Sequence, residues 1–235
     1  MLTVEGIDSY YGLSHILHNV SLTVKKGEIV CLLGRNGAGK TTTMRSIMGL
    51  TPPSRGTITF KDLKISGRKP YQICRMGVGF VPDARIVFAE LTVEENLEIS
   101  ERAPRVSNAS AVWDRETVYQ LFPHLKGIAD RKAGVLSGGE QQMLTIARAL
   151  VTNPEFMLLD EPTEGLAPLI VRMLEENIRE LKNRGLTILL AEQNQQVAFA
   201  LSDRAYVIDN GMIRFSGTID ELKENEEVRK KYLLV

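Results

Sequence analysis

The sequence predicts an α/β domain with a mixed sheet, an inserted α-helical segment and an antiparallel β region near the N-terminus. Three observations lead to this prediction. Apolar runs at residues 29–33 and 156–159 are typical of strands buried on both faces of a sheet. Residues 2–9 and 20–24 alternate apolar and polar side chains, as half-buried strands do. From about residue 85 to 134, strand-like runs give way to helix signals.

Length and composition limit the classes of protein to consider. The 235 residues suffice for one α/β domain, and their 43% apolar content suffices for a full core. Lys+Arg and Asp+Glu are equal at 29 each, which gives no support for a nucleic-acid-binding surface. The chain begins without a secretory signal pattern, and no apolar run approaches the roughly 20 residues of a membrane span. We expect a soluble cytoplasmic protein with Cys31 and Cys74 reduced.

The functional prediction depends first on the pattern G-x-x-x-x-G-K-T, which runs from Gly34 to Thr41 directly after the apolar run. Its glycines let the backbone turn sharply and leave room for a phosphate. Backbone N–H groups then point into one concave nest at the start of a helix predicted over 41–49. We expect Lys40 to reach the β- and γ-phosphates and the Thr41 hydroxyl to ligate Mg²⁺. A turn that merely joins a strand to a helix would not need the Lys-Thr pair. The pattern therefore predicts a P-loop NTPase core, whose nucleotide-binding residues are Gly34, Arg35, Asn36, Gly37, Ala38, Gly39, Lys40, Thr41 and Thr42.

The next segments combine further strands with the helical insertion. Strands are predicted at 57–60 and 77–81. A capping box from Thr92 to Glu95 predicts a helix to about Arg102. A loop over 103–108 and a helix over 109–122, which contains Trp113, follow in the prediction.

Ser137, Gly138 and Gly139 open the helix that follows the insertion. Ser137 and Glu140 form a capping box, and the helix should stop near Pro154. A cap needs one small residue, whereas two further glycines cost helix stability. We therefore predict that a phosphate approaches this helix start, where amide groups and the helix dipole favour an anion.

Two adjacent acids, Asp160 and Glu161, follow the apolar run at 156–159. Burying them is costly unless they are paired or bind a metal ion. With a P-loop upstream, we interpret Asp160 as an Mg²⁺ ligand opposite Thr41, and Glu161 as the group that polarises the attacking water. Solvated acids after a strand are the alternative.

The remaining segments complete the α/β pattern. A helix is predicted over 169–184 and a strand over 186–191. Asp209-Asn210-Gly211 then predicts a hairpin between strands at 205–208 and 212–215.

The P-loop at 34–42, Leu-Ser-Gly-Gly-Glu at 136–140 and the pair Asp160-Glu161, in this order, resemble the ATP-binding-cassette (ABC) family of ATPases. The resemblance covers essentially the whole chain. It implies one ATPase domain over 1–235, with an α/β core at 1–84 and 135–235 and a helical subdomain at about 85–134. It also implies a head-to-tail dimer, in which each ATP lies between one subunit's P-loop and the other's Ser137, Gly138 and Gly139. Tyr11 would stack on adenine, although local sequence alone fits packing at a strand end equally well.

Three positions depart from the general pattern of that family. Asp83 replaces a Gln, and its carboxylate can still touch Mg²⁺ or a bound water. Gln193 replaces a His; it can hydrogen-bond a γ-phosphate but cannot become cationic near neutral pH. Ala167 replaces an Asp. These departures count against a His-based mechanism and shift weight to Glu161 among the predicted catalytic residues, which are Glu161, Gln193 and Lys40.

Residues 81–85, 164–168 and 191–194 resemble the ATPase subunits of branched-chain amino acid importers. That resemblance implies a peripheral protein on the cytoplasmic face of the inner (plasma) membrane, where ATP hydrolysis drives transport by separate transmembrane permeases. A second ABC ATPase subunit, identical or not, and indirectly a periplasmic or extracellular solute-binding protein would be partners. Three alternatives remain: a urea or short-amide importer, a soluble ABC ATPase acting on nucleic acid or the ribosome, and a regulatory subunit with weak hydrolysis.

Overall fold

The computed structural model describes residues 1–102 and 112–233. The loop predicted over 103–108 lies outside the described residues. In the part of the chain that is described, no helix is long and apolar enough to cross a membrane. Cys31 is free and buried, and Cys74 is free and exposed.

A six-stranded sheet lies at the centre of the molecule, in the order β10-β9-β3-β8-β7-β6. Strands β6 to β9 and β3 pair in parallel, and β10 joins the edge antiparallel to β9, so the sheet is mixed as predicted. The strands are β3 (Ile29–Leu33), β6 (Val78–Val81), β7 (Phe156–Asp160), β8 (Thr187–Glu192), β9 (Arg204–Asp209) and β10 (Met212–Thr218).

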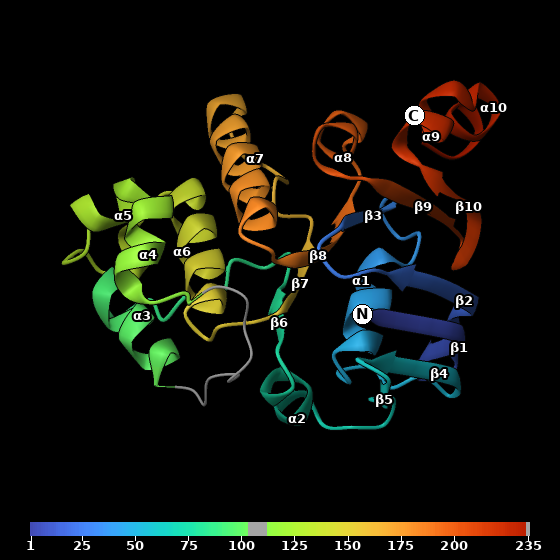
Figure 1. Cartoon of the computed structure of the whole chain (residues 1–235), viewed down its shortest axis with the longest axis horizontal. Coiled ribbons are helices and arrows are strands. Elements are labelled where there is room, and N and C mark those ends of the chain that lie inside the picture. The colour runs from blue at the N-terminus through green and yellow to red at the C-terminus, as the bar shows by residue number, and fades with distance from the viewer. Residues whose placement is uncertain (103–111, 234–235) are drawn as a thin grey trace.

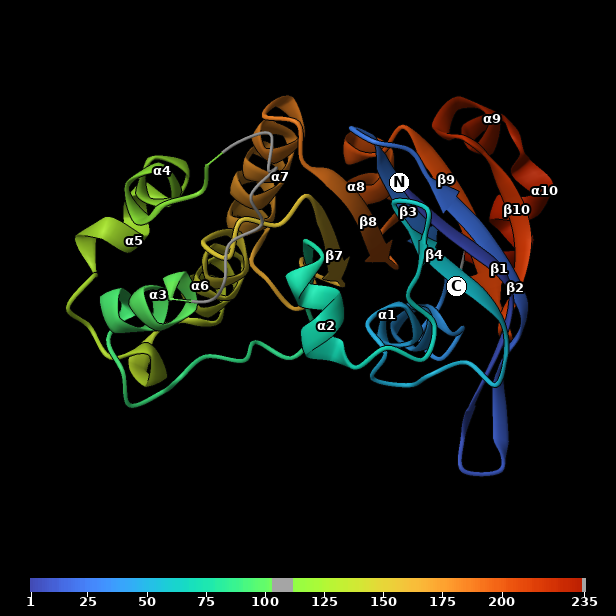
Figure 2. The ribbon, with the colours of Figure 1, turned by 60° about the horizontal axis from the view of Figure 1, so that its bottom comes forward.

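A second, antiparallel sheet has the order β2-β1-β4-β5. It contains β1 (Leu2–Tyr11), β2 (Ser14–Val24), β4 (Arg55–Phe60) and β5 (Leu63–Lys64). Both predicted N-terminal strands are present, and both extend further toward the hairpin that joins them. Strands β1, β2 and β4 lie beside β9 and β10 (Figure 2).

The helices are distributed unevenly around the sheets. They are α1 (Lys40–Ile47), α2 (Pro70–Arg75), α3 (Val93–Glu101), α4 (Arg115–Leu121), α5 (Pro123–Gly127), a 3₁₀ turn (Ala133–Val135), α6 (Gly138–Leu150), α7 (Pro168–Asn183), α8 (Gln195–Leu201), α9 (Ile219–Glu224), α10 (Glu226–Val228) and a π-helical turn (Arg229–Leu233). Helices α3 to α6 gather at one end of the molecule, away from β1, β2 and β4 (Figure 1). The division of the chain at about residues 85 and 134 stays a prediction.

Strand β3 lies between two hydrophobic cores. Ile29, Cys31 and Leu33 face a core formed with the helices, including α6 and α7. Val30 and Leu32 face the other core, which contains α1 and the antiparallel sheet. All five side chains are completely buried, which explains why the run contains no polar residue. The strand that leads into the next turn is therefore held in place by packing on both faces of the sheet.

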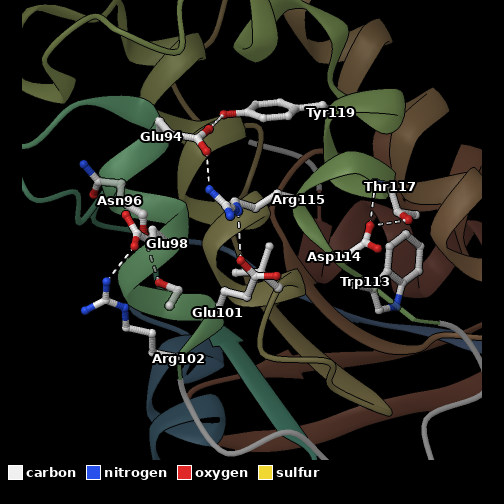
Figure 3. Close-up of polar contacts among 12 residues, drawn as sticks. Glu94, Asn96, Glu98, Glu101, Arg102, Trp113, Asp114, Arg115, Thr117 and Tyr119 are labelled. Carbon is white, nitrogen blue, oxygen red and sulfur yellow. Dashed lines mark hydrogen bonds and ion pairs between the residues drawn. The ribbon is translucent and has the colours of Figure 1, made fainter.

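The helix predicted over 109–122 begins later than expected within the described residues. Asp114 ends the extended segment, because its side chain accepts a hydrogen bond from the Thr117 N–H at 2.8 Å and caps α4 (Figure 3). Trp113 is held before the cap by hydrogen bonds between its backbone and the Asn153 side chain. Asn153 itself has φ +57°, so α6 ends at Leu150 and not at residue 153.

An ionic network joins α3 to α4 (Figure 3). The Arg115 guanidinium pairs with Glu94 and, at 2.8 Å, with Glu101. The Tyr119 hydroxyl donates a hydrogen bond to Glu94. These contacts fix the two helices relative to each other on the side facing solvent.

Candidate nucleotide site

The loop after β3 depends on three glycines for different reasons. Gly37 and Gly39 have φ +78° and +114°, a region that side chains disfavour. Gly34 has an ordinary φ, but a Cβ there would lie 2.4 Å from the Ile208 carbonyl oxygen. The Gly34 N–H donates to the Glu192 carbonyl oxygen at 3.3 Å, which ties the loop to β8. The loop thus needs each of these glycines to hold its shape.

Lys40 is buried at the start of α1, with only 3% of its surface exposed. Its ammonium donates to the carbonyl oxygens of Gly34 at 2.6 Å and Arg35 at 2.9 Å. It also lies 3.0 Å from a carboxylate oxygen of Glu161. Two predicted site residues that are far apart in the sequence are thereby in direct contact.

Glu161 follows β7 in an uncommon backbone conformation. Its φ is +46°, and its N–H donates to the Ala191 carbonyl oxygen at 2.9 Å. A positive φ is costly for a residue with a side chain and persists only where surrounding contacts hold it. Here it turns the Glu161 carboxylate toward Lys40.

Asp160 is completely buried at the end of β7; its carboxylate oxygens form no hydrogen bond of normal geometry, although the Thr41 hydroxyl lies close enough to favour the ionised form. Burial raises the pKa of Asp160 to about 7; the charges of Asp83 and Glu161 add to this, whereas Thr41 and Lys40 oppose it. A buried carboxylate without a hydrogen-bond partner is costly to keep ionised, and a bound cation would offset that cost. In residues 1–102 and 112–233, no group of three or more His, Cys, Asp or Glu side chains is found that could hold a metal ion by itself. The Asp160 carboxylate and the Thr41 hydroxyl are oxygen ligands of the kind that Mg²⁺ takes, and Mg²⁺ needs few protein ligands because it keeps several waters.

Asp83 and Gln193 border the site from two sides. Asp83 is exposed, and its carboxylate accepts the Ala84 N–H at 2.8 Å. Gln193 is exposed and lines a groove of about 860 Å³ that also contains Glu161 and runs between α7 and α8. Ala167 is the residue before α7 and provides no side-chain cap.

Tyr11 lies beside the P-loop. It lines a pocket of about 230 Å³ together with Ile16, Gly37, Gly39, Lys40, Thr41, Thr42 and Glu161. Its hydroxyl accepts a hydrogen bond from Thr51 at 3.4 Å, and 45% of its surface is exposed. The tyrosine is therefore neither packed into the core nor remote from the phosphate loop.

Ser137, Gly138 and Gly139 do not line that pocket. The predicted capping box is present: the Ser137 hydroxyl accepts the Glu140 N–H at 3.3 Å, and Glu140 accepts the Ser137 N–H at 2.7 Å. His124 adds a contact of 2.8 Å to the Glu140 carboxylate. Within the described residues, this helix start thus lies outside the pocket beside the P-loop of its own chain.

The two glycines at the start of α6 lie against side chains that the sequence did not indicate. A Cβ at Gly138 would lie 2.5 Å from a guanidinium nitrogen of Arg85, and one at Gly139 would lie 2.9 Å from Ile170. Arg85 also donates to the Glu164 carbonyl oxygen at 2.5 Å. A larger residue at either position would therefore have to displace the side chain of Arg85 or Ile170.

Sequence reasoning also missed Glu192 and Thr163. Glu192 ends β8, one strand away from Asp160, and its buried carboxylate accepts a hydrogen bond from the Thr163 hydroxyl at 2.7 Å. The sequence did contain a signal for Glu192. Like Asp160, it is an acid at the end of an apolar strand, and that feature was used to identify Asp160 as a site residue.

Comparison with known proteins agrees with this geometry. The family model described as ABC transporter matches residues 17–164. The high-affinity branched-chain amino acid transport ATP-binding protein BraG of Pseudomonas aeruginosa is 43% identical over 99% of both chains. The probable branched-chain amino acid transport ATP-binding protein LivF of Archaeoglobus fulgidus is 39% identical, over 98% of this chain and 97% of the relative. The lipopolysaccharide export system ATP-binding protein LptB of Escherichia coli is 36% identical, over 99% and 96%.

The fold agrees with a solved structure as well. The ADP conformation of an ATP-binding cassette of an ABC transporter matches with a TM-score of 0.83 and 29% sequence identity, over 98% of this chain and 97% of the other. The P-loop, residues 136–140 and the pair Asp160-Glu161 all fall within the segment that the family model matches. The chain therefore belongs to the ABC transporter family, as one of its ATP-binding cassettes.

Proposed function

We propose that the chain is the ATPase subunit of an importer for branched-chain amino acids. The observation that carries the ATPase role is the contact of Lys40 and Glu161 beside the P-loop, next to the buried carboxylate of Asp160, which forms no hydrogen bond of normal geometry. The solute is inferred from similarity to BraG over 99% of both chains.

The residues of the P-loop and those at the ends of β6, β7 and β8 have separate tasks in this proposal. Lys40 and the backbone N–H groups of residues 34–42 bind the phosphates of ATP. Thr41 and Asp160 would hold Mg²⁺, with Asp83 as a further candidate ligand, and the ion would neutralise phosphate charge. Glu161 polarises the attacking water, and Gln193 donates a hydrogen bond to the γ-phosphate.

The partners follow from what one chain lacks. A second cassette supplies Ser137, Gly138 and Gly139 to the ATP held by the first, because in a single chain these residues lie outside the pocket beside the P-loop. Permeases supply the membrane pathway, which places the cassette on the cytoplasmic face of the membrane. A solute-binding protein takes part only indirectly, through the permeases.

We place the permease contact in an apolar pocket of about 410 Å³ close to the Asp83 loop. It is lined by Tyr71, Cys74, Arg75, Val78, Gly79, Phe80, Ala149 and Thr152. Tyr71 is 54% exposed there, and Val78 and Phe80 lie on β6, the strand that leads to Asp83. Movement of that loop on ATP binding would reach the permease directly.

Steady-state hydrolysis of wild type, Glu161→Gln and Lys40→Ala tests the ATPase role. Glu161→Gln should bind ATP but lose turnover, because the amide cannot polarise water as a carboxylate does. Lys40→Ala should lose nucleotide affinity. Near-normal turnover in Glu161→Gln, or unchanged ATP binding in Lys40→Ala, would contradict these roles.

Capture of partners tests the transport role. Tagged Glu161→Gln, held with ATP and Mg²⁺, is recovered from detergent-solubilised membranes of the native cell. Two polytopic permeases and a second cassette would support the importer. Recovery of ribosomal or DNA-repair proteins without membrane proteins would contradict transport and leave the ATPase role intact.

Export is the second candidate, because LptB is 36% identical over 99% of this chain. Vesicles that contain the captured permeases separate the two directions. ATP-dependent accumulation of labelled leucine, delivered by the cognate binding protein, supports import of amino acids. Uptake of urea or a short amide in place of leucine would identify the other importer class that the sequence leaves open.

A further inference from the structure

Glu192 is a buried acid that the roles above do not use. It ends β8 with 3% of its surface exposed. One carboxylate oxygen accepts the Thr163 hydroxyl at 2.7 Å, and the other accepts the Asn194 N–H at 3.4 Å. No ion pair found within residues 1–102 and 112–233 includes Glu192. Burial raises the pKa of Glu192, and the hydrogen bonds from Thr163 and Asn194 only partly oppose this.

A buried acid without a cation is costly to keep, so its contacts indicate what it does. Thr163 lies two residues after Glu161, and Gln193 directly follows Glu192. The carboxylate therefore ties the loop that carries Glu161 to the loop that carries Gln193, through one hydrogen bond between buried atoms.

The backbone around Glu192 makes the same connection from two more sides. The Glu192 carbonyl oxygen accepts the N–H of Gly34, the first glycine of the P-loop. The preceding carbonyl oxygen, of Ala191, accepts the N–H of Glu161 at 2.9 Å. The positive φ of Glu161 needs such support, since little else in the local sequence favours that conformation.

We propose that Glu192 is a positioning residue for ATP hydrolysis: through the Thr163 hydroxyl, its carboxylate sets the spacing of Glu161 and Gln193 around the γ-phosphate. The inference rests on the proposed function, because Glu161 and Gln193 have their roles only in the proposed ATPase. Glu192 itself is assigned no chemistry. In this proposal, Glu192 acts through Thr163 and not on ATP or water itself. It holds two loops that do, and a shift of about 1 Å in such groups can cost up to about 100-fold in rate.

The test compares turnover and ATP affinity in four variants. Glu192→Ala and Thr163→Val each break the hydrogen bond and should lower kcat about tenfold or more, with ATP affinity changed by less than about threefold. Thr163→Ser keeps the hydroxyl and should restore most of kcat. The double variant Glu192→Ala/Thr163→Val should be no slower than the worse single variant, because both remove the same contact.

Thr187→Val is the matched control. Thr187 begins β8, is completely buried, and its hydroxyl accepts the Gly27 N–H at 2.9 Å. The Thr187→Val variant therefore loses a buried hydroxyl contact on β8, the strand that also carries Glu192, but at the end of β8 away from the P-loop. This variant should melt at a lower temperature than wild type and retain wild-type kcat.

The outcomes separate this inference from the proposed function. If wild type hydrolyses ATP, Glu161→Gln does not, and Glu192→Ala and Thr163→Val keep wild-type kcat, the positioning role is wrong and the ATPase stands. Equal loss of kcat in Thr187→Val would also overturn it, because general loosening of β8 would then explain the effect. If wild type hydrolyses no ATP, the proposed function fails first and the inference with it.

Discussion

At the scale of single residues, the site keeps several groups in environments that cost stability. Asp160 is buried without a hydrogen bond of normal geometry, Glu192 is buried without a cation, and Glu161 has a positive φ. Folded proteins tolerate such features mainly at functional sites. All three lie where parallel strands β7 and β8 end, side by side.

Asp160→Asn should make the nucleotide-free chain more stable while it removes Mg²⁺-dependent hydrolysis. Burial raises the pKa of Asp160 to about 7, so the folded chain binds this proton more tightly than the unfolded chain does. As the pH rises from about 4 to about 7, ionisation of Asp160 therefore lowers the free energy of unfolding. The Asn variant cannot ionise, so it does not lose this stability. At pH 8 without Mg²⁺ we expect a gain on the order of 2 kcal/mol, or roughly 5 °C in Tm.

Thermal unfolding with and without Mg-ATP checks this expectation. Mg-ATP should raise the Tm of wild type and have a much smaller effect on the variant. A variant that is less stable than wild type at pH 8 in the absence of Mg²⁺ would show that the Asp160 carboxylate is not destabilising.

At the scale of elements, helix ends and loop contacts rest on a few polar side chains. The capping box of α6 is an example. Partial burial disfavours ionised Glu140, but hydrogen bonds from Ser137 and His124 outweigh it and lower the pKa of Glu140 to about 2. A lowered pKa means that ionised Glu140 contributes stability above its ordinary pKa of 4.5. That contribution is lost as the pH falls from about 4.5 to about 2.

Glu140→Gln should therefore flatten the acid side of the stability profile. Between pH 5 and pH 3, wild type should lose roughly 1–2 kcal/mol more than the variant. Urea unfolding at several pH values measures the difference. Identical pH dependence in the two proteins would mean that Glu140 titrates normally in the folded chain.

The helical end of the molecule offers a comparison between a buried amide and an exposed ion pair. The Asn96 side chain is buried; it accepts the Phe88 N–H at 3.0 Å and donates to the carbonyl oxygens of Phe88, Leu91 and Thr92. Asn96→Ala leaves backbone groups unpaired and should cost about 2–4 kcal/mol. Arg115→Ala breaks pairs that are 22–38% exposed and should cost only about 1 kcal/mol. Chemical denaturation of both variants measures the two losses in free energy of unfolding. A larger loss for Arg115→Ala than for Asn96→Ala would contradict the expectation that the buried amide contributes more than the exposed ion pairs.

At the scale of the whole molecule, the strands were the most predictable part. Their apolar runs reflect burial on both faces, so β3 was predicted to the residue and the other strands of the central sheet nearly so. Helix α8 was missed, because it begins at a cap formed by Asn194 and spans only seven residues without a clear apolar period. Residues 112–114 were wrongly assigned to a helix, because the Asn153 contact that holds Trp113 extended joins distant parts of the chain.

In the candidate site too, features contained in one short segment were predictable, and contacts between distant segments were not. The P-loop, Asp160 and Glu161 could be predicted because their chemistry lies in short segments. The contact of Arg85 with Gly138 and that of Thr163 with Glu192 could not, because each depends on how separate elements pack.

The proposed position of ATP between two chains predicts that dimerisation depends on ATP. Glu161→Gln should change from monomer to dimer when ATP is added, and Gly138→Glu in the same background should remain a monomer, because an anion at that helix start repels the phosphate. Light scattering coupled to gel filtration measures the mass directly. Dimerisation that does not depend on ATP would contradict a nucleotide held between two chains.

The contact between Lys40 and Glu161 has a consequence for affinity. The Lys40 ammonium has three oxygen partners within the chain, one of them anionic. An incoming phosphate must therefore compete with a carboxylate that belongs to the chain itself, and part of the binding free energy is used to displace it. Glu161→Gln weakens this internal competitor, so it should bind a non-hydrolysable ATP analogue more tightly than wild type does. The residue assigned to end each ATP cycle by hydrolysis would then also restrain how readily the next cycle begins.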